Sequence, residues 1–197
     1  MAGEPDNNAG GVLVAVRTRP TTVFAQDELV VDPQTGHLTV RPPPDHVFSR
    51  AAGKSATPGG EAMAPSEMDF HFDCVLHNAR QDTVYESVAR EIVQKTTQGT
   101  SGAIMAYGQT GSGKTYTMMG DTNNYTNRGI APRALGQIFE EIDSRPDVEY
   151  NVEISYMEIY NEKIYDLLKP EDVPEPDYVL GEDPTYGVIV KGLSRHK

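Results

Sequence analysis

The sequence predicts an α/β fold in which helices flank a central, mostly parallel β-sheet. Two observations lead to this prediction. Short apolar segments of strand length alternate along the chain with amphipathic segments of helical periodicity. In addition, a glycine-rich loop lies between the apolar run Ala103 to Tyr107 and a segment free of Gly and Pro that begins at Lys114. Strand, loop and helix follow one another as a phosphate-binding loop requires.

The glycine-rich loop matches the phosphate-binding pattern G-x-x-x-x-G-K-[ST] at every fixed position. It consists of Gly108, Gln109, Thr110, Gly111, Ser112, Gly113, Lys114 and Thr115. Its glycines allow positive φ angles and bring backbone N–H groups close to a polyphosphate. The Lys114 ammonium can contact the outer phosphates, and the Thr115 hydroxyl can bind the accompanying Mg²⁺ ion. The alternative is an accidental match in a glycine-rich turn, which the flanking strand and helix disfavour.

The chain before this loop begins with residues 1–11, which are polar and predicted to be disordered. Val12 to Val16 then predicts a buried strand. Pro20 stops this strand and leaves Arg17 and Arg19 at its end. In isolation this is an ordinary strand terminus.

A small hairpin is predicted next, from residues 29–31 and 37–40, because Pro and Gly between them favour a turn. The composition of residues 41–67 then changes to Pro, Ala, Gly and Ser, which predicts a flexible loop insertion. Alternating residues from Phe70 to Val75 predict another strand, in which Cys74 is interpreted as a small buried hydrophobe.

A helix is predicted to follow, capped by Thr83 with Glu86 three residues later and ended by Gly99. Its apolar residues Val84, Val88 and Ile92 share one face. Tyr85 lies at the start of the helix and at the edge of this face. Packing in the core is therefore the simple interpretation of Tyr85.

After the phosphate-binding loop, a second amphipathic helix is predicted from Pro132 to Ser144. Residues 150–160 form the longest strand candidate. Residues 170–186 are rich in Pro, Asp and Glu and predict an exposed acidic loop. Val188 to Val190 predicts a last short strand.

Composition limits the possible partners. The chain has 17 basic and 29 acidic residues, giving a net charge of −12. Nucleic acids and anionic membranes need a basic face, so we expect neither as a partner. A single cysteine allows no disulfide framework and favours a reducing, cytosolic setting. The sequence shows no pattern of a signal peptide and no apolar run that approaches 18 residues, so we expect neither a signal peptide nor a membrane span.

Beyond these features, five stretches of the sequence together resemble the front half of a kinesin motor domain. They are Arg17 to Pro20, Phe70 to Asp73, Tyr107 to Met118, Gly129 to Leu135 and Ser155 to Glu162. The resemblance covers residues 12–197, and within the family it is greatest to the ninth subfamily, which is associated with cilia and flagella. An unrelated phosphate-loop ATPase or kinase is a further alternative, which the Ser155 to Glu162 stretch disfavours.

The resemblance implies a P-loop NTPase-type fold that binds ATP with Mg²⁺, with Thr115 as the metal ligand. It places Arg17, Arg19 and Pro20 near the adenine and ribose, with Tyr85 stacking on the base. It also implies microtubules as the partner, an oligomeric full-length protein, and a location on the cytoskeleton in the cytoplasm and in cilia or flagella.

The 197 residues lack two stretches that the family uses to couple hydrolysis to movement, Asn-x-x-Ser-Ser-Arg-Ser-His and Asp-Leu-Ala-Gly-Ser-Glu. We therefore expect ATP binding without turnover from these residues, and hydrolysis from a full-length motor. Residues 150–170, a microtubule-contacting region in the family, contain only Lys163 and Lys169 as bases, which predicts weak microtubule binding. The alternative is a naturally short, non-motile nucleotide-binding or interaction module.

Overall fold

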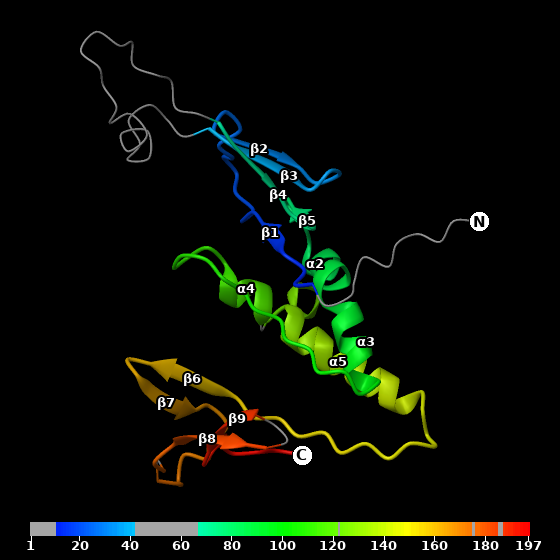
Figure 1. Cartoon of the computed structure of the whole chain (residues 1–197), viewed down its shortest axis with the longest axis vertical. Helices are drawn as coiled ribbons and strands as arrows, with labels where there is room; N and C mark the ends of the chain where they lie inside the picture. The colour runs from blue at the N-terminus through cyan, green and yellow to red at the C-terminus, as the bar shows by residue number, and fades with distance from the viewer. Residues whose placement is uncertain (1–10, 42–66, 122, 175, 185–186) are drawn as a thin grey trace. The chain divides into compact units, whose positions relative to one another are not determined.

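The computed structural model describes residues 11–41, 67–121, 123–174, 176–184 and 187–197. The chain divides into two compact units, Met1–Ser144 and Arg145–Lys197 (Figure 1). The predictions of a disordered segment at residues 1–11 and a flexible insertion at residues 41–67 fall almost wholly outside the described residues. At the ends of the insertion, Arg41 Nε lies 2.8 Å from Glu67 Oε1.

The first unit contains the parallel strand pair that the fold class predicts. Strand β1 (Ala15–Arg17) pairs in parallel with β5 (Cys74–Leu76), with Ala15 opposite Cys74 and Arg17 opposite Leu76. The Asp73 carboxylate fixes the register by accepting a hydrogen bond of 2.7 Å from the Val14 N–H. The pair therefore holds the end of β1 at a defined position next to the chain that enters the first helix.

An antiparallel sheet precedes β5 in the same unit (Figure 1). It consists of β2 (Leu29–Asp32), β3 (His37–Val40) and β4 (Met68–His71) in the order β2-β3-β4. The predicted hairpin is confirmed by the antiparallel pairing of β2 with β3, and the Asp32 carboxylate accepts hydrogen bonds within its turn. The predicted strand from Phe70 to Val75 is instead divided, because the chain passes there from this sheet to the parallel pair.

Three helices form the core of the first unit. They are α2 (Gln81–Val88), α3 (Arg90–Thr97) and α5 (Ile130–Asp143). The prediction of one helix capped by Thr83 is wrong in two respects: the N-cap is Arg80, so that α2 already begins at Gln81, and Ala89, with φ −123°, separates α2 from α3. The helical segment ends as predicted next to Gly99, whose φ of 94° favours glycine. Leu76, Val84, Tyr85, Ala89 and Ile130 are the buried residues of this core.

The strand predicted before the glycine-rich loop does not form in the part of the chain that the structure describes. Residues 101–108 have no regular structure, and the side chains of Met105 and Tyr107 are 88% and 96% exposed. A strand needs a neighbour for its N–H and C=O groups, and here none is paired with it. The predicted mostly parallel central sheet is therefore represented in the described residues by β1 and β5 alone, while the other sheets are antiparallel.

The second unit contains two antiparallel hairpins. Strands β6 (Met157–Tyr160) and β7 (Lys163–Asp166) are joined by Asn161 and Glu162, both with positive φ, as a tight two-residue turn requires. Strands β8 (Val179–Asp183) and β9 (Gly187–Lys191) form the other. The prediction for residues 150–160 is confirmed only for β6. The acidic segment 170–186 is not a loop throughout, since it contains β8.

In the second unit, the Asp166 carboxylate connects the end of β7 to the segment after β9. Its side chain is 8% exposed and accepts hydrogen bonds from the Ser194 N–H at 2.6 Å and the Leu168 N–H at 3.0 Å. Burial by itself raises the pKa of Asp166, but these backbone hydrogen bonds outweigh it and lower the pKa below the ordinary value.

We expect Asp166→Ala to destabilise the second unit by about 1–3 kcal/mol, because two backbone N–H groups lose their acceptor. The contribution of Asp166 is present above the ordinary carboxyl pKa of about 3.9 and is lost as the pH falls through the lowered folded-state pKa. Urea unfolding at pH 7 and at acidic pH measures both effects. Asp172→Ala, at an exposed position, is the control, and an equal loss in that variant would contradict the assignment.

Candidate functional site: the glycine-rich loop

The glycine-rich loop turns sharply between residue 108 and helix α4 (Lys114–Met118). Gly108, Gly111 and Gly113 have φ angles of 153°, 80° and 104°, which other residues rarely adopt. A Cβ atom at Gly108 would lie 2.6 Å from the Ser112 Oγ atom. The glycines of the pattern therefore stand where the backbone of this loop needs them.

Lys114 lies in the first turn of α4 and folds back over the loop. Its Nζ atom donates hydrogen bonds to the Gly108 carbonyl at 2.8 Å and the Gln109 carbonyl at 3.0 Å. The ammonium is thus positioned over the loop backbone, where a polyphosphate would meet it. Thr115 follows directly and is exposed, so its hydroxyl is accessible to a metal ion.

An open pocket of about 630 Å³ adjoins the loop, a size typical of small-molecule sites. Among the described residues it is lined by Arg19, Pro20, Thr110, Gly111, Gly113, Lys114, Thr115 and Tyr116. Arg19 also donates a hydrogen bond of 2.8 Å to the Gly111 carbonyl, which joins the end of the β1 segment to the loop. Most of the predicted site residues therefore meet at one surface, and the two cations there suit an anionic ligand.

Arg17 is oriented differently from Arg19 and does not line this pocket. Its guanidinium donates hydrogen bonds to Gln81 Oε1 and Thr117 Oγ1, both at 2.9 Å, and to the Ala79 carbonyl at 3.2 Å. Burial lowers the pKa of this guanidinium, although arginine stays charged in proteins. Arg17 reaches the pocket only through Tyr116, whose ring centroid is 5.7 Å from the Arg17 Cζ atom.

Tyr85 lies in the core and not at the pocket. It is 4% exposed, and its hydroxyl donates a hydrogen bond of 2.5 Å to Gln137 Oε1. Burial raises the pKa of the phenol. A ring enclosed in this way has no free face for a base, so the stacking role predicted for Tyr85 does not fit its position.

The aromatic side chain at the pocket is Tyr116, which is 41% exposed. Tyr116 is not among the residues that the sequence predicts to contact the nucleotide. A signal was available, because Tyr116 directly follows Lys114 and Thr115 in the first turn of α4 and must lie near the phosphate-binding loop.

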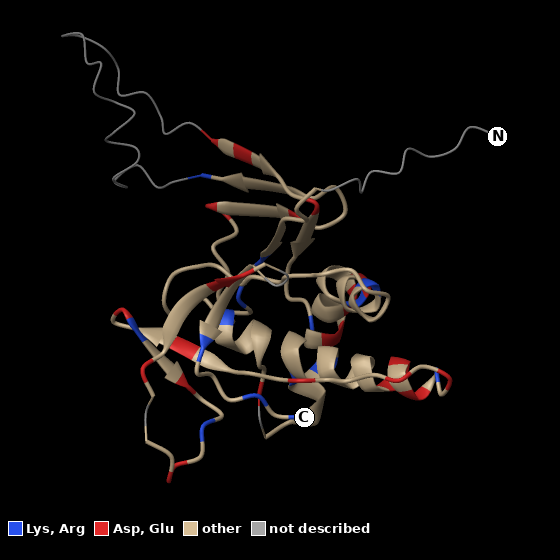
Figure 2. Cartoon of the chain, turned by 60° about the horizontal axis from the view of Figure 1, so that its bottom comes forward, with Lys and Arg blue, Asp and Glu red and all other residues tan. Residues whose placement is uncertain are grey.

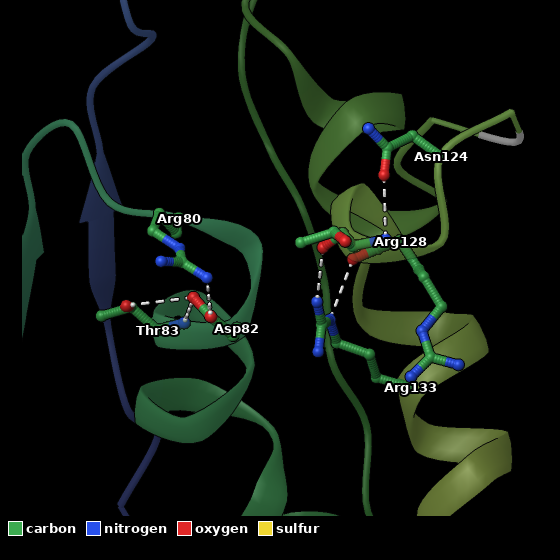
Figure 3. A network of polar contacts seen from close by, with 7 residues as sticks. Arg80, Asp82, Thr83, Asn124, Arg128 and Arg133 are labelled. Atoms are coloured by element: carbon green, nitrogen blue, oxygen red, sulfur yellow. Dashed lines mark hydrogen bonds and ion pairs between the residues drawn. The ribbon is translucent and has the colours of Figure 1, made fainter.

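The segment after α4 returns along the helix and is held by α5. Arg133 of α5 donates hydrogen bonds to the Arg128 carbonyl at 2.9 Å and the Thr126 carbonyl at 2.8 Å (Figure 3). The Asn124 side chain caps the short helix η1 (Tyr125–Asn127) by accepting from the Thr126 N–H. A Cβ atom at Gly120 would lie 2.2 Å from the Asn127 carbonyl oxygen, so this close backbone approach requires glycine.

The comparisons with known proteins identify the family. The kinesin motor domain model matches residues 43–197. Kinesin-like protein KIF9 of Homo sapiens is 50% identical over 134 residues, which cover 66% of this chain and 17% of that protein. KIF9 of Mus musculus is 41% identical over 184 residues, and kinesin-like protein KLP1 of Chlamydomonas reinhardtii 39% over 183 residues. These two matches cover 92% and 93% of this chain and 22% of each relative.

The chain belongs to the kinesin motor domain family, a family of cytoskeletal microtubule motors, and the predicted resemblance, including that to the ninth subfamily, is confirmed. The family implies an α/β fold of the P-loop NTPase type that binds nucleotide with Mg²⁺. The chain spans between 17% and 22% of the length of these curated relatives.

In the part of the chain that the structure describes, no helix is long and apolar enough to cross a membrane. The same residues contain no group of three or more His, Cys, Asp and Glu side chains that could hold a metal ion. The Mg²⁺ expected at Thr115 needs no such group, because Mg²⁺ in phosphate-binding sites keeps several waters and uses phosphate oxygens as ligands.

We expect Tyr85→Phe to lower the free energy of unfolding by about 1–2 kcal/mol, because the buried Gln137 oxygen loses its donor. Denaturant unfolding followed by far-UV circular dichroism measures this loss. Tyr165→Phe, at a residue of the second unit that is 38% exposed, is the control. Unchanged stability of Tyr85→Phe would contradict the buried hydrogen bond.

Proposed function

We propose that this chain is the ATP-binding N-terminal part of a kinesin microtubule motor, which in its full-length form couples ATP hydrolysis to movement along microtubules. The observation that carries the proposal is the glycine-rich loop, which opens on a pocket lined by Lys114 and Arg19. Family membership supports the microtubule partner and the nucleotide.

Different groups of the loop would contact different parts of a triphosphate. Backbone N–H groups of residues 109–114 would surround the inner phosphates. Lys114 would exchange the Gly108 and Gln109 carbonyls for phosphate oxygens, which its flexible side chain allows. The Thr115 hydroxyl would be a ligand of Mg²⁺, which neutralises charge on the phosphates.

The adenine and ribose would occupy the other part of the pocket. Arg19 and Pro20 line it from the end of the β1 segment, and Tyr116 lines it from α4. An aromatic ring that is 41% exposed offers one face to a base. We therefore assign the stacking role to Tyr116 in place of Tyr85.

The 197 residues themselves are proposed to bind ATP without turning it over. The Asn-x-x-Ser-Ser-Arg-Ser-His and Asp-Leu-Ala-Gly-Ser-Glu stretches, which would position water and stabilise the transferred phosphoryl group, are not in this sequence. Lys114 and Thr115 can hold the ground state, but transition-state stabilisation needs further groups.

Charge supports a weak contribution of these residues to microtubule binding. Basic side chains are scattered among more numerous acidic ones (Figure 2). The expectations that the chain binds neither nucleic acid nor membrane, that the full-length motor is oligomeric, and that it acts in the cytoplasm and in cilia or flagella stay predictions.

The first test of the proposal is Lys114→Ala, which should abolish MgATP binding because the ammonium that would contact the outer phosphates is lost. Isothermal titration calorimetry gives the Kd. Lys95→Ala is the control, because Lys95 pairs with Glu91 on the exposed face of α3. An unchanged MgATP affinity in Lys114→Ala would refute the phosphate-binding role of the loop.

A second test separates base from phosphate recognition. Tyr116→Ala should weaken MgATP binding about tenfold and leave binding of inorganic triphosphate unchanged, because only ATP has a base to stack. Tyr85→Leu should reduce the melting temperature but leave the ratio of the two affinities unchanged. If Tyr85→Leu alone weakened ATP selectively, the base would lie at Tyr85.

A further inference from the structure

Helix α4 carries three proposed ligand contacts but has little to hold it in place by itself. It has five residues, none of them buried, and its N-cap Gly113 contributes no side-chain hydrogen bond. Helices this short are marginal in isolation. The position of Lys114, Thr115 and Tyr116 therefore depends on contacts that α4 makes with other elements.

Gln81, the first residue of α2, supplies such contacts. Its side chain is 4% exposed, and its amide nitrogen donates to the Tyr116 carbonyl at 2.7 Å and to the Asn127 carbonyl at 3.2 Å. Because α4 has only five residues, Tyr116 also belongs to its last turn, where carbonyls lack donors from the helix itself. Gln81 thus completes α4 and joins it to the segment that returns beside it.

Arg17 extends this connection to the parallel strand pair. It donates to the Gln81 side-chain oxygen and to the Thr117 hydroxyl, so that one guanidinium joins β1, α2 and α4. Arginine suits this role because its fork of donors can serve several acceptors in fixed directions. The side-chain amide of Gln81 is then hydrogen-bonded through both its oxygen and its nitrogen, so only one orientation of the amide satisfies all these bonds.

We infer that Gln81 and Arg17 are positioning residues of the nucleotide site, which hold α4 so that Lys114, Thr115 and Tyr116 face one pocket. The inference rests on the proposed function. Neither side chain lines the pocket. Their loss should therefore weaken all ligands of the loop alike, whereas a residue that contacts the base affects only ligands that have one.

The chain offers a matched control in Gln137 of α5. Gln137 is also buried, at 7% exposure, and is also bonded through both amide atoms, to the Tyr85 hydroxyl and the Arg90 carbonyl. Its partners belong to α2 and α3, not to α4. A buried glutamine that only stabilises the fold should behave as Gln137 does.

The experiment compares Gln81→Leu with Gln137→Leu in the 197-residue chain. Calorimetric titrations with MgATP and with magnesium triphosphate give the affinities, and thermal unfolding gives the stability. We expect Gln81→Leu to weaken both ligands on the order of tenfold and in equal proportion. Gln137→Leu should lower the melting temperature and leave both affinities within about twofold of the unsubstituted chain.

Arg17→Lys is the second variant, which keeps the charge but cannot reach Gln81, Thr117 and Ala79 together. It should weaken both ligands equally, and adding it to Gln81→Leu should cost little more, because the two residues act through one network. If Gln81→Leu fails to fold, the same parallel loss in Arg17→Lys decides the question.

Three results would overturn the inference. Unchanged affinities in Gln81→Leu or Arg17→Lys would show that α4 needs no such support. A loss confined to ATP would make these residues base contacts. An equal loss of affinity in Gln137→Leu would show that the weaker binding comes from a less stable fold and not from the position of α4. Failure of the unsubstituted chain to bind either ligand is a distinct result, because it overturns the proposed function as well.

Discussion

The phosphate-binding loop depends on hydrogen bonds that come from outside it. Its glycines set the local backbone, but the helix that follows is too short to position itself, and the buried amide of Gln81 and the guanidinium of Arg17 connect it to α2 and β1. Arg17 is in turn placed by the parallel pairing of β1 with β5. The site is thus assembled from segments up to 100 residues apart, and each of them is fixed by polar contacts with defined directions.

A second constraint is that apolar residues with the pattern of a strand, such as residues 103–107, have no neighbouring strand to pair with in the described part of the chain. Met105 and Tyr107 precede the loop in an apolar run and are almost fully exposed, and Val12 at the start of the β1 segment is 86% exposed. Buried apolar side chains and paired backbone groups stabilise a central strand. In the described residues, the segment before the loop has no strand pairing, and its large apolar side chains are exposed except Ile104, which is partly buried against the core. By contrast, the helices of the first unit pack against one another, and Val84 in α2 and Ala89 between α2 and α3 are buried in their core.

Local patterns were predicted well, because they need no distant partner. The loop, the hairpin of β2 and β3, and α5 follow from glycine positions, turn residues and helical periodicity in single segments. The division into α2 and α3 and the failure of residues 103–107 to form a strand depend on packing elsewhere. Within the site, Tyr85 was interpreted as a base contact from resemblance, while its place in the apolar face predicted packing, which the structure shows. Nothing in the sequence near Gln81 indicates its role, since its partners lie 35 to 64 residues away.

Hydrogen–deuterium exchange of the 197-residue chain with and without MgATP shows whether nucleotide is held on a loop and helix that β1 and α2 fix in place. We expect slower exchange on MgATP addition in residues 108–119 and in the first turn of α2, with no change in β6 to β9. Unchanged exchange in residues 108–119 at saturating MgATP would contradict it.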